Sequence, residues 1–165
     1  MPSVKTLILG MGNPILTDDS IGCRLATAAK AALGALPAID VVEECSVGGL
    51  NLLDVIAGYD RVIVLDSIRT RGGTPGDLYR FTAADLRATQ HLSNVHDANF
   101  ATALELGRRM GMALPRDDQI HVFAVEIVDN ETFGEALTEP LARRFPELVS
   151  RVVDAAREIL RTPSA

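Results

Sequence analysis

Residues 7–22, LILGMGNPILTDDSIG, decide how the fold begins. An aliphatic run that ends in a glycine turn is typical of a strand followed by a phosphate-binding helix. Here the turn precedes Asp18 and Asp19, which are two negative charges where a phosphate needs amide donors. The stretch also lacks the third glycine of GxGxxG, and no acidic ribose-binding residue follows at a suitable distance. A dinucleotide site is therefore disfavoured, and this stretch alone leaves open what its carboxylates bind.

The rest of the chain alternates between strand-like and helix-like segments. We predict strands at 4–10, 39–46, 62–65, 77–82 and 119–128, and helices at 20–36, 48–58, 97–112 and 140–160. Pro146 should kink or divide the last helix, and RTRGGTPG at 69–76 is the best candidate for a mobile loop. The alternation predicts one α/β domain over residues 1–165, with a mostly parallel sheet between layers of helices.

The composition excludes several classes of partner. The chain has a formal net charge of −6, which argues against binding to nucleic acid or to an anionic membrane. The first ten residues hold one lysine and a very short apolar run, so neither a signal peptide nor a membrane span is predicted there. Only two cysteines occur, which fits a reducing compartment, and we expect a cytoplasmic protein.

Polar residues follow the predicted strands at the edge where parallel sheets form their sites. This set comprises Asn13, Asp18, Asp19, Asp66, His96 and Glu126. Two carboxylates and an imidazole make an open site for a divalent metal such as zinc, nickel or iron(II). Their spacing is not specific by itself, because the chain has no HxxEH or CxxC run.

Each of these residues also has a structural interpretation. Asp18 or Asp19 caps the helix that begins near Ser20, Asp66 caps a turn, or His96 is an exposed loop histidine. The chain has no GxSxG motif, so a serine nucleophile is disfavoured.

The two cysteines are weak candidates for a nucleophile. Cys23 sits on a mostly aliphatic segment and is interpreted as a buried structural thiol. Cys45, near a strand end, is the better candidate nucleophile of the two, although a structural role is favoured for it as well.

Taken together, these residues resemble the hydrogenase maturation endopeptidases. That family opens with an aliphatic strand and a G-x-G-N-x-x-x-x-D-[DE]-G-x-G segment, which GMGNPILTDDSIG at 10–22 matches closely, with Ser20 where glycine is usual. VIVLDSI at 62–68 is similar to the second family motif, and VHDANFATALELG at 95–107 is similar to the third. The chain departs from the family at ECSVGG, residues 44–49, where a glycine- and threonine-rich segment is typical. That departure leaves open which hydrogenase is the substrate.

The resemblance implies a fold, an activity and a set of site residues. The fold is a three-layer α/β/α sandwich of the phosphorylase/hydrolase-like kind. The activity is removal of the C-terminal extension of a nickel-loaded [NiFe] hydrogenase large-subunit precursor by a metal-dependent endopeptidase. Asp19, Asp66 and His96 are implied as the catalytic, metal-contacting residues, with Asp18 as a neighbour that is not a ligand. The nickel belongs to the substrate, and the isolated protein can bind other divalent cations at the same site.

Other functions are weighed against this one. A non-catalytic nickel-site sensor or chaperone for the same precursor uses the same three ligands. Peptidyl-tRNA hydrolase shares the GxGNP opening, but Thr17 to Ser20 offer no histidine-asparagine pair, and the negative charge opposes tRNA. A third alternative is a nucleotide-binding module. In that case nucleotide should raise the thermal stability of the protein, and Asp19→Asn and His96→Ala should not affect its function.

Overall fold

A five-stranded sheet forms the centre of the molecule. The structure is a computed structural model that describes residues 3–88 and 95–164, without the side chains of residues 87–88 and 95–99. The strands are β1 (Thr6–Met11), β2 (Ile39–Cys45), β3 (Arg61–Ile68), β4 (Leu78–Thr82) and β5 (Ile120–Glu126), in the sheet order β2-β1-β3-β5-β4. Every neighbouring pair is parallel except β4 and β5, which are antiparallel at one edge. The predicted mostly parallel sheet is confirmed.

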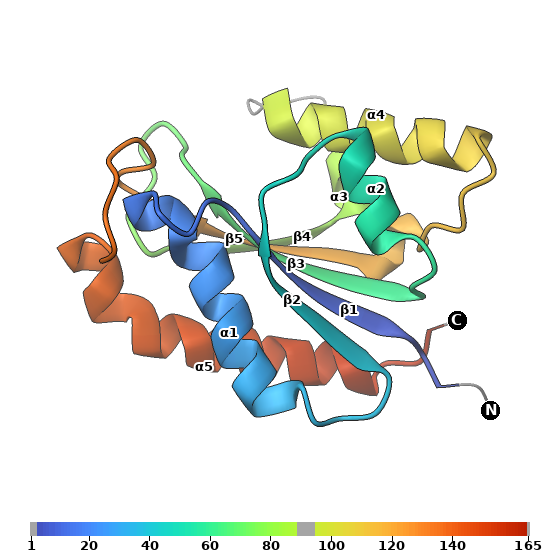
Figure 1. The fold of residues 1–165 in the computed structure, drawn as a ribbon, viewed down its shortest axis with the longest axis horizontal. Helices are drawn as coiled ribbons and strands as arrows, with labels where there is room; N and C mark the ends of the chain where they lie inside the picture. Colours follow the sequence, from blue (N-terminus) through green and yellow to red (C-terminus); the bar gives the residue numbers. More distant parts are fainter. Residues whose placement is uncertain (1–2, 89–94, 165) are drawn as a thin grey trace.

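Helices cover both faces of this sheet (Figure 1). On one face lie α1 (Ile21–Leu33) and α5 (Glu139–Arg161), and on the other lie α2 (Leu50–Ile56), α3 (Ala83–Ala88) and α4 (Val95–Arg109). Two short 3₁₀ helices, η1 (Thr17–Ser20) and η2 (Asp117–Gln119), precede α1 and β5. The arrangement confirms the predicted three-layer α/β/α sandwich. No helix among the described residues is long and apolar enough to cross a membrane.

The inner strands β1, β3 and β5 carry mostly apolar, buried residues because both faces of the sheet are covered. On β1, Ile8 packs among the side chains of α1 and α5, whereas Leu7 and Leu9 belong to the cluster beneath α2 and α4. Alternate side chains of a strand point to opposite faces. A strand buried on both sides therefore has a continuous run of hydrophobic residues, as at 7–9 and 62–65 in this sequence.

Three details differ from the sequence-based expectation. The strand expected to end at Asp66 continues to Ile68, so Asp66 lies inside β3. The short helix α3 was not predicted. The division of the last helix at Pro146 was wrong, because α5 is one helix with Pro146 inside it. Pro146 and Ala142 are both exposed, so the carbonyl of Ala142, which loses its amide partner, can bond to water.

Candidate functional site

Asp19 lies in η1, which follows the carboxyl end of β1. The connection from β1 to α1 lies at the left-hand end of the sheet in Figure 1. Its Oδ2 accepts a 2.8 Å hydrogen bond from the backbone N–H of Asn13. Gly12 has a φ of +128°, and a Cβ there would lie 2.1 Å from the carbonyl oxygen of Asp19. The glycine is therefore required for this close approach of the turn to residue 19, and a phosphate is not needed to explain it.

Asp66 is joined to Asp19 through a single intervening residue, Ser67. The Ser67 hydroxyl donates a 2.8 Å hydrogen bond to Oδ1 of Asp19. Its backbone N–H donates a 2.8 Å hydrogen bond to Oδ1 of Asp66. β1 and β3 are neighbours in the sheet, which is why residues 48 positions apart meet at this edge. The structure thus brings together two of the three predicted site residues, and Ser67 is a contributor that the sequence analysis missed.

His96, the third predicted residue, lies by its backbone in the first turn of α4. Its side chain is outside the described residues, so its relation to the two carboxylates stays a prediction. Among the side chains that the structure does describe, no group of three or more His, Cys, Asp or Glu residues is arranged to hold a metal. A three-ligand site at this edge therefore needs a side chain outside the described ones, and His96 is the predicted ligand.

Asp18 has a structural role that differs from the capping interpretation. Neither Asp18 nor Asp19 is the N-cap of α1: that position is held by Ser20, whose side chain makes no capping hydrogen bond. Instead the fully buried carboxylate of Asp18 accepts hydrogen bonds from the backbone N–H groups of Val128, Asp129 and Thr138, at 3.1, 3.0 and 2.8 Å. Asp18 thereby fixes the segment after β5 against the turn that carries Asp19.

Glu126 anchors the 69–76 loop and has a structural role as well. Its buried carboxylate accepts hydrogen bonds from the N–H and the hydroxyl of Thr70, at 2.7 and 2.8 Å, and its carbonyl accepts one from the N–H of Gly76. A Cβ at Gly73 would lie 2.5 Å from the Glu126 carboxylate oxygens, so a larger residue there would have to displace this carboxylate from its bonds with Thr70. Both ends of the loop are therefore tied to β5, and its mobility stays a prediction.

The thiol of Cys23 lies near the negatively charged carboxylates of the site. The buried thiol donates to the carbonyl of Gly12 at 3.6 Å. Burial, together with the negative charges of Glu44, Asp19 and Asp66, raises the pKa of Cys23 to about 11. The thiol is therefore protonated at neutral pH, which supports the interpretation of Cys23 as structural.

Native Cys23 is expected to react with iodoacetamide at least about a hundredfold more slowly near pH 8 than the same residue in urea-unfolded protein. Only the thiolate reacts, and a pKa raised by about two units lowers its population about a hundredfold. Peptide-resolved mass spectrometry of the alkylated protein measures both rates. Equal rates in native and unfolded protein would contradict the buried, protonated state.

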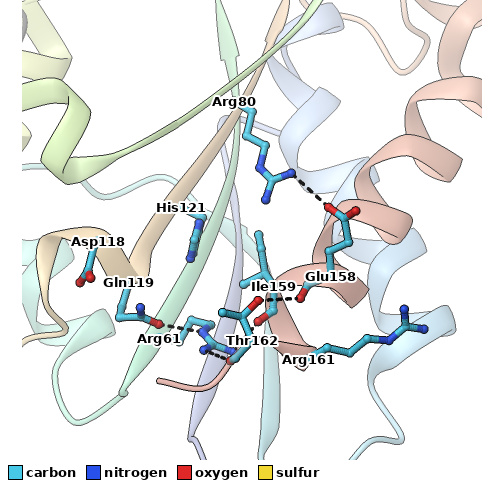
Figure 2. A pocket seen from close by; sticks show the side chains of 9 residues that line it. All are labelled: Arg61, Arg80, Asp118, Gln119, His121, Glu158, Ile159, Arg161 and Thr162. Carbon is cyan, nitrogen blue, oxygen red and sulfur yellow. Dashed lines mark hydrogen bonds and ion pairs between the residues drawn. The ribbon is translucent and has the colours of Figure 1, made fainter. Parts of the chain in front are cut away.

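A pocket of about 420 Å³ lies at the opposite end of the sheet, beside the amino ends of β3 and β5 (Figure 2). None of the predicted site residues lines it. Figure 2 shows Arg61 turned toward Gln119 and the end of α5, where its guanidinium donates to the carbonyls of Ile159 and Thr162 at 2.8 and 2.7 Å. We interpret this pocket as a structural feature, because its buried arginine donates hydrogen bonds to carbonyls at the end of α5, where the last turn of a helix lacks amide partners of its own.

Comparison with known proteins gives consistent matches. The profile of the family HycI, described as hydrogenase maturation protease, matches residues 23–155, a range that includes Asp66 and His96 and begins after Asp19. The Hydrogenase 2 maturation protease of Escherichia coli (strain K12) is 32% identical over 75 residues, which are 46% of this chain and 45% of that protein. The hydrogenase expression/formation protein HupD of Rhizobium leguminosarum bv. viciae is 24% identical over 164 residues, covering 94% of this chain and 76% of HupD.

The fold is also shared with solved structures. The hydrogenase maturating endopeptidase HybD from E. coli superimposes with a TM-score of 0.69 over 93% of each chain, at 23% sequence identity. At this identity the likeness supports the fold alone. The sequence matches and the shared fold agree with the resemblance carried by the motifs at 10–22, 62–68 and 95–107.

Proposed function

This chain belongs to the hydrogenase maturation protease family, and from that premise we propose that it is an endopeptidase that removes the C-terminal extension of a [NiFe] hydrogenase large-subunit precursor. The precursor is cut after it has been loaded with nickel, and the nickel is part of the substrate. The two unpaired cysteines support a reducing compartment, so we place the reaction in the cytoplasm.

The observation that carries this proposal is the bridge from Asp19 through Ser67 to Asp66 at the carboxyl edge of the sheet. Two negatively charged groups held close together favour a cation between them. Asp19 uses one lone pair on each oxygen for Asn13 and Ser67, and further lone pairs remain for a metal. Hydrogen bonds of this kind orient a carboxylate ligand before the metal arrives.

In the proposed complex, Asp19, Asp66 and His96 bind the nickel of the precursor. Oxygen and imidazole donors suit a borderline divalent ion such as nickel. A metal bound there can polarise the scissile carbonyl or activate a water molecule. The protein's own contribution is to position the C-terminal extension, with the carboxylates fixed by Ser67 and by the turn at Gly12.

The test is to incubate a nickel-loaded large-subunit precursor with the protein and to follow the precursor by mass spectrometry. Loss of a C-terminal peptide is expected, and a precursor without nickel should stay intact. A precursor that binds the protein but is never cut would favour a nickel-site sensor or chaperone. A precursor that neither binds nor is cut would contradict both functions.

Replacing Ser67 with alanine is expected to lower kcat/KM for this cleavage about tenfold. The hydroxyl donates to the Asp19 carboxylate, and the loss of such a supporting hydrogen bond typically costs 10- to 100-fold. Ser67→Thr is the matched control, because it keeps a hydroxyl and should retain most of the activity. Equal rates for Ser67→Ala and the wild type, in a time course of precursor cleavage, would show that this hydrogen bond does not support the site.

A further inference from the structure

Exposed apolar side chains gather at the end of the sheet that carries Asp19. Eight large apolar residues are exposed in the part of the chain that the structure describes. Five of them follow the carboxyl ends of β1, β2 and β5, namely Ile15, Val47, Leu50, Val128 and Phe133. Exposed apolar groups that cluster around a site mark a surface where another protein binds.

Three of these residues lie on two segments that are joined to each other. We call Ile15, Val128 and Phe133, which are 57%, 42% and 74% exposed, the rim patch. An isolated antiparallel bridge pairs Leu16 with Phe133, and the N–H of Gly134 donates to the carbonyl of Ile15 at 3.0 Å. In Figure 1 the turn after β1 and the segment after β5 lie together at the left-hand end of the sheet.

The rim patch is held in a fixed position relative to Asp19. The carboxylate of Asp18 accepts hydrogen bonds from Val128, Asp129 and Thr138, and these bonds span both ends of the segment that carries Phe133. Asp18 is also the direct neighbour of Asp19. A surface ordered before binding loses less conformational entropy when a partner docks, so this arrangement favours binding.

The charges around the rim patch indicate the chemistry of the partner. Residues 127–138 contain three acidic residues, Asp129, Glu131 and Glu135, and no lysine or arginine. Glu131 and Glu135 are exposed, and no ion pair joins either carboxylate to a described residue. Arg24 donates to the carbonyl of Glu135, and Arg69 donates to the side-chain oxygen of Asn130, so neither bond is to a carboxylate of this segment.

We propose that the rim patch docks the hydrogenase large-subunit precursor through an apolar segment flanked by lysine or arginine. This inference rests on the proposed function and adds a second contact to it, away from the nickel. The apolar side chains of the precursor cover Ile15, Val128 and Phe133, while its basic residues face Glu131 and Glu135. Such a contact sets the affinity for the folded precursor and leaves the chemical step to Asp19 and Asp66.

The test compares Phe133→Ser with Phe133→Leu and Met110→Ser. Met110 is 67% exposed and directly follows α4. In Figure 1 the carboxyl end of α4 lies on the opposite side of the molecule from the segment after β5, so Met110 is a matched control. Phe133→Ser should raise KM for the nickel-loaded precursor at least about tenfold and leave kcat unchanged. The docking contact stabilises the bound precursor and the transition state to the same extent, so its loss weakens binding without slowing the chemical step. Phe133→Leu and Met110→Ser should retain a KM near that of the wild type.

Binding measured at low and at high salt tests the charged part of the proposal. The wild type should bind the precursor more weakly at high salt, and Glu131→Lys should weaken binding most at low salt. A wild-type KM for Phe133→Ser, with normal cleavage by the wild type, would overturn the docking inference and leave the proposed function standing. Failure of the wild type to bind or cut the precursor would overturn both.

Discussion

Replacing Asp19 with asparagine is expected to lower kcat/KM for precursor processing by at least about a hundredfold while the fold is retained. The substitution keeps the size of the side chain and removes the negative charge that is proposed to bind the nickel of the precursor. It also replaces one of the two oxygens that accept hydrogen bonds from Asn13 and Ser67 with an NH₂ group, which can only donate. The carboxylate therefore loses its charge and its orientation at the same time.

The measurement is a mass-spectrometric time course of cleavage, with circular dichroism to confirm that the variant is folded. Asp154→Asn is the matched control, because Asp154 is an exposed carboxylate on α5 whose loss changes the net charge by the same amount. It should process the precursor at the wild-type rate. Undiminished cleavage by Asp19→Asn would exclude Asp19 as a metal-contacting residue, whereas equal losses in both variants would point to net charge alone.

Most of the fold could be predicted from the sequence because buried parallel strands leave a strong local signal. The predicted strands at 4–10 and 62–65 contain the uninterrupted apolar runs LIL and VIVL, and both became inner strands of the sheet. The helix α3 was missed because six residues carry too little periodicity to be recognised. The continuity of α5 through Pro146 depends on the exposure of that side of the helix, which only the tertiary structure decides.

The candidate site was predictable in part. Asp19 and Asp66 follow or end apolar runs, and the topology of a parallel sheet brings such positions to one edge. The roles of the paired aspartates were not separable, since Asp18 and Asp19 are adjacent and chemically identical. Asp18 turns into the interior and binds backbone N–H groups more than a hundred residues away. Contacts of that kind leave no local pattern in the sequence.

A large loss of stability is expected from a substitution at Gly22, the last glycine of the opening motif. A Cβ at Gly22 would lie 2.3 Å from the carbonyl oxygen of Leu65 and 2.4 Å from that of Met11. Both atoms belong to backbone at the carboxyl ends of β3 and β1, so neither can turn aside as a side chain would. Gly22→Ala therefore has to lift the first turn of α1 off the sheet, which we expect to cost about 3 kcal/mol of unfolding free energy.

The same displacement should reduce cleavage, because α1 begins two residues after Asp19 and lies across the strand that holds Asp66. Urea unfolding followed by circular dichroism measures the stability, and Gly48→Ala is the control. A Cβ at Gly48 meets nothing within 4 Å, so that variant should stay within about 0.5 kcal/mol of the wild type. If Gly22→Ala unfolded at the wild-type urea midpoint, α1 would not rest directly on the two carbonyls. The motif glycine would then have to be explained by the chemistry of the site, since the packing of the helix would not require it.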